Sequence, residues 1–337
     1  MDNNSLNLPH QLATTCYHVQ MSENKEKSYP VRQIEVEEGY AGQRLDNFLL
    51  AQLKGVPKSR VYRIVRKGEV RVNRGRTKVS YRLQQGDIVR IPPIRIAEKE
   101  TAVTPGNRIL EQLQDSILYE DKRLLILNKP SGLAVHGGSG LKFGVIEAIR
   151  TLRPNEKQLE LVHRLDRDTS GCLMIARRRS ALRALHELLR GSGVDKRYMA
   201  LVAGRWKSDR ETVDVPLSKN HLQGGERVVR VDPDGKEAKT KFKVLERFSN
   251  STLVEAELLT GRTHQLRVHL DYLGTPILGD EKYGDQSANR SMKQMGLKRL
   301  FLHAKSLSFN WDESAGSLKV EAPLESALEL LLNKLRK

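Results

Sequence analysis

Five charged or titratable side chains stand together near the middle of the chain, in segment 161–171 (LVHRLDRDTSG). An aspartate that lies in a cleft beside an arginine stays ionised at neutral pH. Such a positioned carboxylate, Asp166 or Asp168 here, can act as a nucleophile or as a general base. The other interpretation is a surface loop whose Asp and Arg residues pair with one another, because such ion pairs are common and weak. Spacing alone leaves both open.

A second concentration of polar residues lies in segment 260–270 (TGRTHQLRVHL). Leu266, Leu270 and Leu273 recur at helical spacing, and Gly274 follows them as a helix stop. This pattern places Arg262 at or before the start of the predicted helix, from where its guanidinium is free to reach into a cleft.

The sequence gives little support for a metal, nucleotide or disulfide site. His264 and His269 have no third ligand nearby in the sequence, which favours structural histidines over a metal centre. Cys16 and Cys172 lie far apart, so neither a disulfide framework nor a Cys-x-x-Cys site is indicated, and a reducing cytoplasm is the expected setting. The glycine-rich turn 136–140 lacks the residue spacing of phosphate-binding loops.

The elements that must position these residues predict an α+β fold. An apolar run at 172–176 follows the central loop and is typical of a buried strand. Strands joined by hairpin turns at 232–235 and 249–251 and separated by single helices favour a mixed, largely antiparallel sheet over a doubly wound fold. Further strands are predicted at 116–120, 124–127, 196–204 and 300–304, and helices at 144–153, from residue 180, and at about 325–335.

Residues 31–95 form a second predicted unit with two short helices and several strands. The first helix presents Leu45, Phe48 and Leu49 on one face. The second follows Pro57, has Ser59 as its candidate N-cap and ends at Gly68. Strands at 69–73 and 87–91 alternate apolar and polar residues.

Positive charge dominates the protein and this unit above all. The chain carries a formal net charge of +17, and residues 31–95 contain 15 Lys and Arg against 6 Asp and Glu. Such a surplus attracts polyanions, so nucleic acid is the predicted partner. A membrane is not expected, because no stretch approaches the ~18 apolar residues of a spanning helix. Cations on the outward face of the second helix are predicted to contact phosphates, with a merely solvated helix face as the alternative: Lys58, Arg60, Arg63 and Lys67.

Several motifs together resemble the RluA family of pseudouridine synthases. They are His-Arg-Leu-Asp at 163–166 with Thr-Ser-Gly at 169–171, Lys-Arg-Tyr at 196–198, and Gly-Arg-Thr-His-Gln-Leu-Arg at 261–267. Residues 31–95 resemble the S4-type RNA-binding module. The similarity covers about residues 30 to 330. It implies an S4-like domain (31–95) and a pseudouridine synthase domain (115–337). The polar residues 1–30 carry no sustained period and are expected to be disordered, and the mixed polar run at 96–114 is expected to be a linker.

The resemblance also implies roles for residues in these motifs. Asp166 would be the catalytic aspartate, Tyr198 would stack on the target base, and Arg262 would pair with the carboxylate. Asp168 is then not the nucleophile.

Three further residues are expected to contact the substrate. Leu266 would lie beside the uracil ring, Arg164 would fill the gap left by the flipped uridine, and His163 belongs to the same substrate-binding set. The reaction breaks the bond from C1′ to N1, turns the uracil and rebonds it through C5, so it needs a flipped nucleotide and a carboxylate within reach.

The expected function is isomerisation of several uridines of bacterial 23S ribosomal RNA by a cytoplasmic monomer that needs no cofactor and no metal. Open alternatives are another ribosomal or transfer RNA target and an S4-type assembly factor without activity. DNA binding through the helix pair is a further alternative. The extension before residue 31 is not explained by the resemblance.

Overall fold

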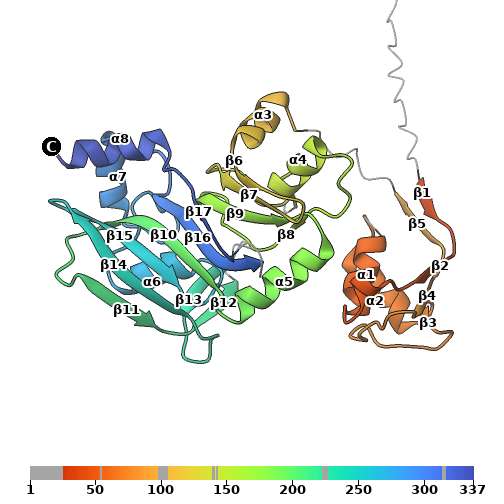
Figure 1. Ribbon diagram of the computed structural model, residues 1–337. Coiled ribbons are helices and arrows are strands. Elements are labelled where there is room, and N and C mark those ends of the chain that lie inside the picture. The colour runs from red at the N-terminus through yellow and green to blue at the C-terminus, as the bar shows by residue number, and fades with distance from the viewer. Residues whose placement is uncertain are drawn as a thin grey trace, which may run out of the picture. The chain divides into compact units, whose positions relative to one another are not determined.

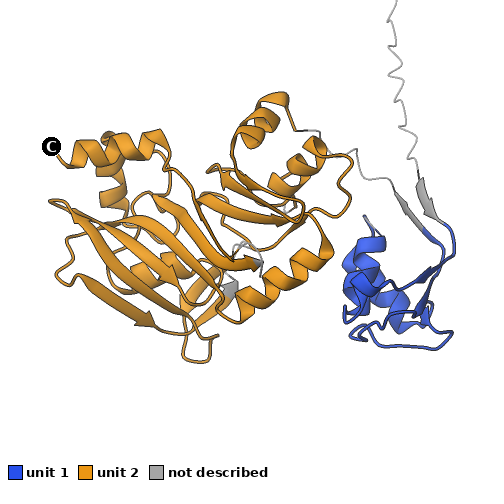
Figure 2. Ribbon diagram, in the orientation of Figure 1, with its two compact units in different colours: residues 1–101 blue, residues 102–337 orange. Residues whose placement is uncertain are grey.

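The chain consists of two compact units, residues 1–101 and 102–337, and each is described by itself (Figure 2). In this computed structural model, the described residues are 26–53, 55–97, 105–138, 141, 143–221, 227–312 and 316–337. Most of the predicted N-terminal extension therefore lies outside the described residues. Its last part differs from the prediction, because β1 (Glu26–Tyr29) pairs antiparallel with β5 (Ile94–Ala97). A strand of only four residues is too short to show an alternation of apolar and polar residues, and its partner strand is distant in the sequence.

The first unit packs two helices on a small antiparallel sheet (Figure 1). The strands follow the order β2, β4, β3, and the predicted helix pair and strands are present. The elements are β2 (Arg32–Glu35), the 3₁₀ turn η1 (Glu38–Tyr40), α1 (Leu45–Gln52), α2 (Lys58–Arg66), β3 (Arg71–Val72) and β4 (Ile88–Ile91). Apolar residues of both helices and of the sheet share one buried cluster.

Helix α2 begins two residues earlier than its predicted cap implies. Pro57, and not Ser59, is the N-cap, and the helix starts at Lys58. Proline suits a helix start because its missing N–H has no partner to lose there. Gly68 ends this segment with a φ of +71°, as its position in the sequence predicted.

A buried carboxylate ties the two helices together. Asp46 of α1 accepts hydrogen bonds from Arg44 (Nε 3.1 Å, Nη2 2.9 Å) and from the hydroxyl of Tyr62 on α2 (2.6 Å). The bonds from Arg44 lower the pKa of Asp46 from 3.8 to about 2. This link fixes the angle at which α2 presents its cations.

The second unit is built on a ten-stranded sheet with the order β11, β14, β15, β10, β16, β9, β7, β6, in which β17 also pairs with β16 and β8 with β9. Among the described strands of this sheet, only β9 and β16 run parallel. The predicted mixed, largely antiparallel sheet is confirmed. Its strands are β6 (Ile117–Glu120), β7 (Leu124–Lys129), β8 (Glu160–Leu161), β9 (Ser170–Ala176), β10 (Val194–Ala203), β11 (Arg210–Asp214), β14 (Lys239–Arg247), β15 (Ser251–Leu258), β16 (Leu302–Asp312) and β17 (Gly316–Glu321).

Helices cover both faces of this sheet because its central strands are apolar on both sides (Figure 1). On β7, Leu125 and Leu127 pack in a cluster with residues of α3 and α4, while Leu124 and Ile126 pack in one with α5. On β10, Tyr198 and Ala200 share the first cluster with α6, and Leu201 shares another with α7 and α8. The helices are α3 (Asn107–Asp115), α4 (Val145–Leu152), α5 (Arg179–Arg190), α6 (Gln265–Tyr272), α7 (Gln286–Gln294) and α8 (Ser326–Leu335).

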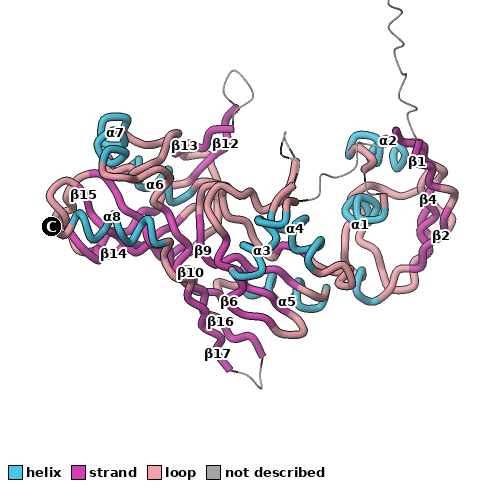
Figure 3. Tube along the Cα trace, turned by 90° about the horizontal axis from the view of Figure 1, so that it is seen from above, coloured by secondary structure: helices cyan, strands magenta, loops and turns pink. Residues whose placement is uncertain are grey.

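The segment predicted as a linker, 96–114, contains the end of β5 in the first unit and most of α3 in the second. On α3, Leu113 is buried, and Ile109 and Leu110 pack against the same hydrophobic cluster. A separate hairpin of β12 (Leu217–His221) and β13 (Arg227–Val231) lies beside α6, as Figure 3 shows from above. Within the described part of the chain, no helix is long and apolar enough to span a membrane.

Candidate active site

Asp166 lies on the loop between β8 and β9, and this loop is tied to the end of β7. The backbone oxygen of Arg167 accepts hydrogen bonds from Gly132 N–H and from Lys129 Nζ, both at 2.9 Å. The hydroxyl of Ser131 donates to the backbone oxygen of Asp168 at 2.8 Å. The side chain of Asp166 keeps 26% of its surface exposed. The loop is thus rigidly held while its carboxylate stays accessible.

Lys129, the last residue of β7, is fully buried and was not among the predicted site residues. Its ammonium donates to three backbone oxygens, those of Pro130 (2.8 Å), Leu133 (2.7 Å) and Arg167 (2.9 Å). Burial lowers its pKa to about 7, and the nearby charge of Arg299 acts in the same direction. Its contacts make it a support for the loop that carries Asp166.

The backbone at residue 171, where the loop continues into β9, requires a glycine. Its φ is +106°, and a Cβ at this position would lie 2.2 Å from the backbone oxygen of Ala304 on β16. The parallel pairing of β9 with β16 therefore requires a residue without a side chain here. This close approach fixes the strand that follows Asp166.

Arg267 of α6 is the arginine that faces Asp166. Its Nη1 lies 3.5 Å from Asp166 Oδ2. Its Nε and Nη2 each donate to one oxygen of Asp280 at 2.7 Å, and the Asp280 side chain is fully buried. A bidentate pair of this kind fixes the plane of the guanidinium. Asp280 thereby aims Arg267 at the carboxylate of Asp166.

The predicted pairing of Arg262 with Asp166 is wrong in this structure. Arg262 is exposed, and its Nε donates to the backbone oxygen of Glu237 at 2.8 Å. It precedes α6, as predicted, but α6 begins only at Gln265, and Arg267 lies inside the helix on the side that meets Asp166. Both arginines belong to the same motif, and spacing did not distinguish them.

Apolar residues from three predicted motifs meet on one face of the sheet. Leu165, Tyr198 and Leu266 are each less than 9% exposed and belong to one hydrophobic cluster. Burial raises the pKa of the Tyr198 hydroxyl, and the negative charge of Asp166 nearby raises it further. The structure therefore brings the tyrosine and the leucine to the same side as the carboxylate, as expected.

The other residues of the central loop have different surroundings. His163 accepts a hydrogen bond on Nε2 from Met174 N–H of β9 at 3.1 Å, and burial lowers its pKa to about 4. This contact gives His163 a structural role, and its expected place among the substrate-binding residues stays a prediction. Arg164 is exposed, as a residue that enters RNA must be. Arg167 and Asp168 pair with each other at 3.0 Å.

The two histidines of the second polar segment have different contacts. His269 is fully buried and bonds through Nδ1 to the hydroxyl of Thr240 at 2.9 Å, which makes it a structural histidine as predicted. His264 is not structural in that sense, because its Nε2 lies 3.8 Å from Asp166 Oδ1. No group of three or more His, Cys, Asp or Glu side chains among the described residues is placed to hold a metal ion.

Comparison with known proteins agrees with this geometry. The sequence profile of the RNA pseudouridylate synthase family matches residues 123–272, which include Asp166, Tyr198 and Arg267, and the profile of the S4 domain matches residues 43–89. A protein of Pasteurella multocida named ribosomal large subunit pseudouridine synthase C is 55% identical over 319 residues, 94% of this chain and 98% of the relative. The chain belongs to the RNA pseudouridylate synthase family. It is an isomerase of this type, with an S4 domain before its synthase domain.

Other relatives and solved structures agree with this assignment. The protein of the same name from Escherichia coli K12 is 57% identical over 299 residues, 88% of this chain and 94% of the relative. Human RNA pseudouridylate synthase domain containing 4 has a solved structure with 30% identity and a TM-score of 0.57, covering 68% of this chain and 96% of that one.

In the S4 domain, α2 carries the cations that were predicted to contact RNA. Lys58, Arg63 and Lys67 are exposed, and Arg60 is half-buried. The opposite side of α2 is apolar, with Val61, Ile64 and Val65 buried. The helix thus has the polarity that phosphate contact requires.

Proposed function

We propose that this pseudouridine synthase converts uridines of 23S ribosomal RNA into pseudouridine, with Asp166 as the catalytic carboxylate. Relatives named for the ribosomal large subunit, at 55–57% identity over most of the chain, support this substrate. The observation that carries the proposal is the position of Asp166, partly exposed on a rigid loop and 3.5 Å from Arg267. The proposal includes a cytoplasmic location and action as a monomer.

The arrangement gives each group a task in the isomerisation. The bond from C1′ to N1 breaks, a bond from C1′ to C5 forms, C5 loses a proton and N1 gains one. Arg267 keeps Asp166 ionised and aimed at the flipped nucleotide. Tyr198 and Leu266 form the apolar wall against which the freed uracil turns, and Arg164 occupies the space that the base leaves in the RNA. Asp166 starts the reaction before the ring is freed, by one of three routes that lead to cleavage of the bond from C1′ to N1: attack on the base, attack on C1′, or removal of a proton from the sugar.

The experiment that tests the proposal compares the wild type with Asp166→Asn. The substrate is a 23S ribosomal RNA transcript that carries tritium at C5 of uridine, since the reaction releases that hydrogen to water. We expect the variant to lose tritium release and to keep RNA binding in a filter assay at stated salt. Full activity of the variant would refute the role of Asp166. If the variant loses both RNA binding and thermal stability, its inactivity is explained by misfolding instead.

A second measurement separates the possible targets. Carbodiimide-dependent stops of primer extension on RNA from a deletion strain map the missing pseudouridines. Stops lost only from 23S ribosomal RNA support the proposal, whereas stops lost from 16S ribosomal or transfer RNA would replace its substrate. An unchanged pattern together with defective ribosome assembly would favour the assembly-factor alternative.

A further inference from the structure

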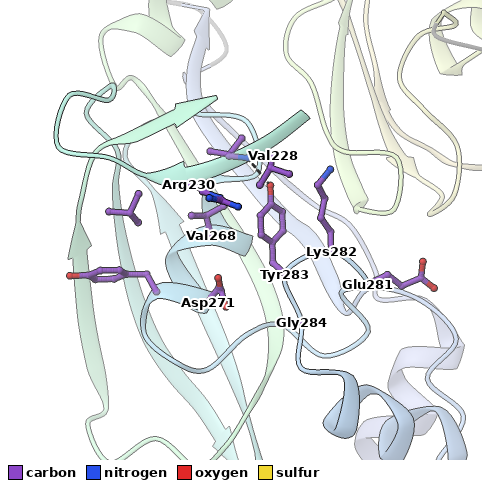
Figure 4. A pocket seen from close by; sticks show the side chains of 11 residues that line it. Val228, Arg230, Val268, Asp271, Glu281, Lys282, Tyr283 and Gly284 are labelled. Carbon is purple, nitrogen blue, oxygen red and sulfur yellow. Dashed lines mark hydrogen bonds between the residues drawn. The ribbon is translucent and has the colours of Figure 1, made fainter. Parts of the chain in front are cut away.

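Tyr283 connects the active site to the β12–β13 hairpin. Its hydroxyl accepts a hydrogen bond from Val229 N–H of β13 at 3.0 Å and lies 2.8 Å from Nδ1 of His264. The guanidinium of Arg267 stands 4.9 Å from the centre of the same ring. Figure 4 shows the tyrosine pointing from its turn toward β13. The ring therefore touches two groups that face Asp166.

The bond from Val229 sets the direction of the hydrogen bond between Tyr283 and His264. An N–H can only donate, so it takes one lone pair of the hydroxyl oxygen. The O–H proton of Tyr283 then has Nδ1 of His264 as its acceptor. A neutral imidazole that accepts on Nδ1 carries its proton on Nε2. The opposite tautomer would turn the lone pair of Nε2 toward a carboxylate oxygen, which is repulsive.

We propose that Tyr283 is a positioning residue for the isomerisation, which holds His264 as the Nε2–H tautomer so that this N–H serves as a donor to Asp166 Oδ1. The inference rests on the proposed role of Asp166. The two oxygens of the carboxylate then have separate partners, His264 at 3.8 Å from Oδ1 and Arg267 at 3.5 Å from Oδ2. The contact from Arg267 is a long hydrogen bond, and the separation from His264 exceeds hydrogen-bond distance; catalytic hydrogen bonds are often long in the absence of substrate.

The surroundings keep His264 neutral. Burial lowers the pKa of its imidazole, and although Asp166 opposes this, the charges of Arg267 and Lys282 lower it further. Asp280 also faces the ring and is neutralised by its pair with Arg267. His264 therefore adds a donor beside Asp166 without adding a second positive charge. Arg267 supplies the positive charge beside Asp166, and His264 supplies a hydrogen-bond donor that orients the carboxylate.

The backbone of His264 is held in a conformation that few side chains adopt. Its φ and ψ are 55° and 18°, in the left-handed region, at the residue that precedes α6. Non-glycine residues occupy this region at a cost, and they concentrate at functional sites. In this conformation the imidazole lies between Tyr283 and Asp166.

The first test measures the tautomer directly and needs no RNA. Protein labelled with ¹⁵N in histidine is examined by ¹H–¹⁵N correlation spectra, and the His264 signals are assigned by their absence from His264→Gln. We expect a proton on Nε2 and none on Nδ1 in the wild type, and exchange between the two forms in Tyr283→Phe. A proton on Nδ1 in the wild type would overturn the inference.

The second test separates positioning from folding by single-turnover tritium release. Tyr283→Phe removes one hydroxyl and keeps the ring that packs against Val229 and Val268 beside a cavity of about 720 Å³. We expect a rate about ten-fold lower with an unchanged Kd for RNA. Tyr272→Phe on the same cavity, where the ring is 57% exposed, is the matched control and should match the wild type. A wild-type rate in Tyr283→Phe would refute the proposal.

Two substitutions of His264 complete the test. The amide nitrogen of His264→Gln reaches the place of Nε2 and restores a donor that needs no tyrosine, whereas His264→Asn reaches only the place of Nδ1. We expect the single-turnover rate of His264→Gln to be several-fold higher than that of His264→Asn. Adding Tyr283→Phe to His264→Gln should lower this rate only slightly further. Equal rates of Gln and Asn would contradict the donor role. If the wild type releases no tritium from 23S ribosomal RNA, the proposed substrate fails while the tautomer test still decides this inference.

Discussion

Both oxygens of Asp280 hold the guanidinium of Arg267, each at 2.7 Å. Burial alone would raise the pKa of Asp280, but the hydrogen bonds from Arg267 keep it below its ordinary value. The third nitrogen of Arg267 is left for Asp166. The charge beside the proposed catalytic carboxylate thus depends on a second carboxylate that is fully buried.

Asp280→Asn should therefore impair both catalysis and folding. The amide cannot accept from both nitrogens, so Arg267 loses its fixed plane and we expect a rate lower by about 10- to 100-fold. Removing one partner of a buried pair should also cost about 3 kcal/mol of unfolding free energy. Single-turnover tritium release and urea unfolding measure the two effects. Asp271→Asn, on the exposed side of α6, is the control, and equal rates of the two variants would contradict the argument.

Exchanging each arginine of the third motif for lysine should distinguish their roles. Arg267→Lys keeps the charge but cannot bond to both oxygens of Asp280, so we expect a rate about 100-fold lower. Arg262→Lys changes an exposed side chain whose Nε bonds to Glu237 O, and its single-turnover rate at saturating RNA should stay within about two-fold. The opposite ranking would restore Arg262 as the partner of Asp166.

The choice between these arginines shows how far the sequence could go. The three sequence motifs and their order along the chain were enough to predict that Asp166, Tyr198 and Leu266 lie together. The spacing of apolar residues was enough to predict the α+β class and most of the helices. The start of α6 was not predictable, because it depends on the left-handed backbone of His264. That start decides which arginine turns toward Asp166.

Support residues were missed for a related reason. Lys129, the last residue of β7, and Asp280, in an irregular segment, act through contacts with residues distant in sequence. Tyr283 gives no signal until β13 lies beside it. His163 was placed with the substrate because its motif is catalytic, although its ring nitrogen bonds to β9. Tertiary contacts, rather than local pattern, determine the roles of these four residues.

Gly171→Ala should destabilise the synthase domain strongly. The new methyl group would overlap Ala304 O at 2.2 Å, and the φ of +106° is unfavourable for alanine. We expect a loss of more than about 3 kcal/mol in unfolding free energy, measured by urea titration. Gly274→Ala has a φ of +70° but no atom within 4 Å of the added Cβ, and should cost about 1 kcal/mol. Similar losses in both variants would mean that the strand contact contributes little.

The Asp46 carboxylate should make the stability of the S4 domain depend on pH. Its pKa is about 2 in the folded chain against an ordinary value of 3.8, so folding favours the ionised form. Its contribution is complete well above pH 3.8 and is lost as the pH falls through that value toward 2. Comparing wild type with Asp46→Asn should give a stability difference that shrinks from pH 6 to pH 3. A difference that is constant over this range would refute the argument.

The cations of α2 should contribute RNA affinity without affecting the chemical step. Lys58, Arg63 and Lys67 are exposed on one helix, and each phosphate contact that they make releases counterions. Replacing all three with alanine should weaken binding and reduce the slope of log K against log salt by about 2 to 3. The single-turnover rate at saturating RNA should stay unchanged, because Asp166 and its partners are untouched.

A charge-matched variant gives the control for that prediction. Lys241 and Lys243 of β14 are exposed and alternate with Phe242, which packs in the same cluster as Tyr198, so they point away from the catalytic face of the sheet. Replacing these two and the exposed Lys207 removes the same charge from the protein. If both triple variants lower the salt slope equally, net charge rather than α2 accounts for the affinity. A reduced slope in the α2 variant alone would place phosphate contacts on that helix.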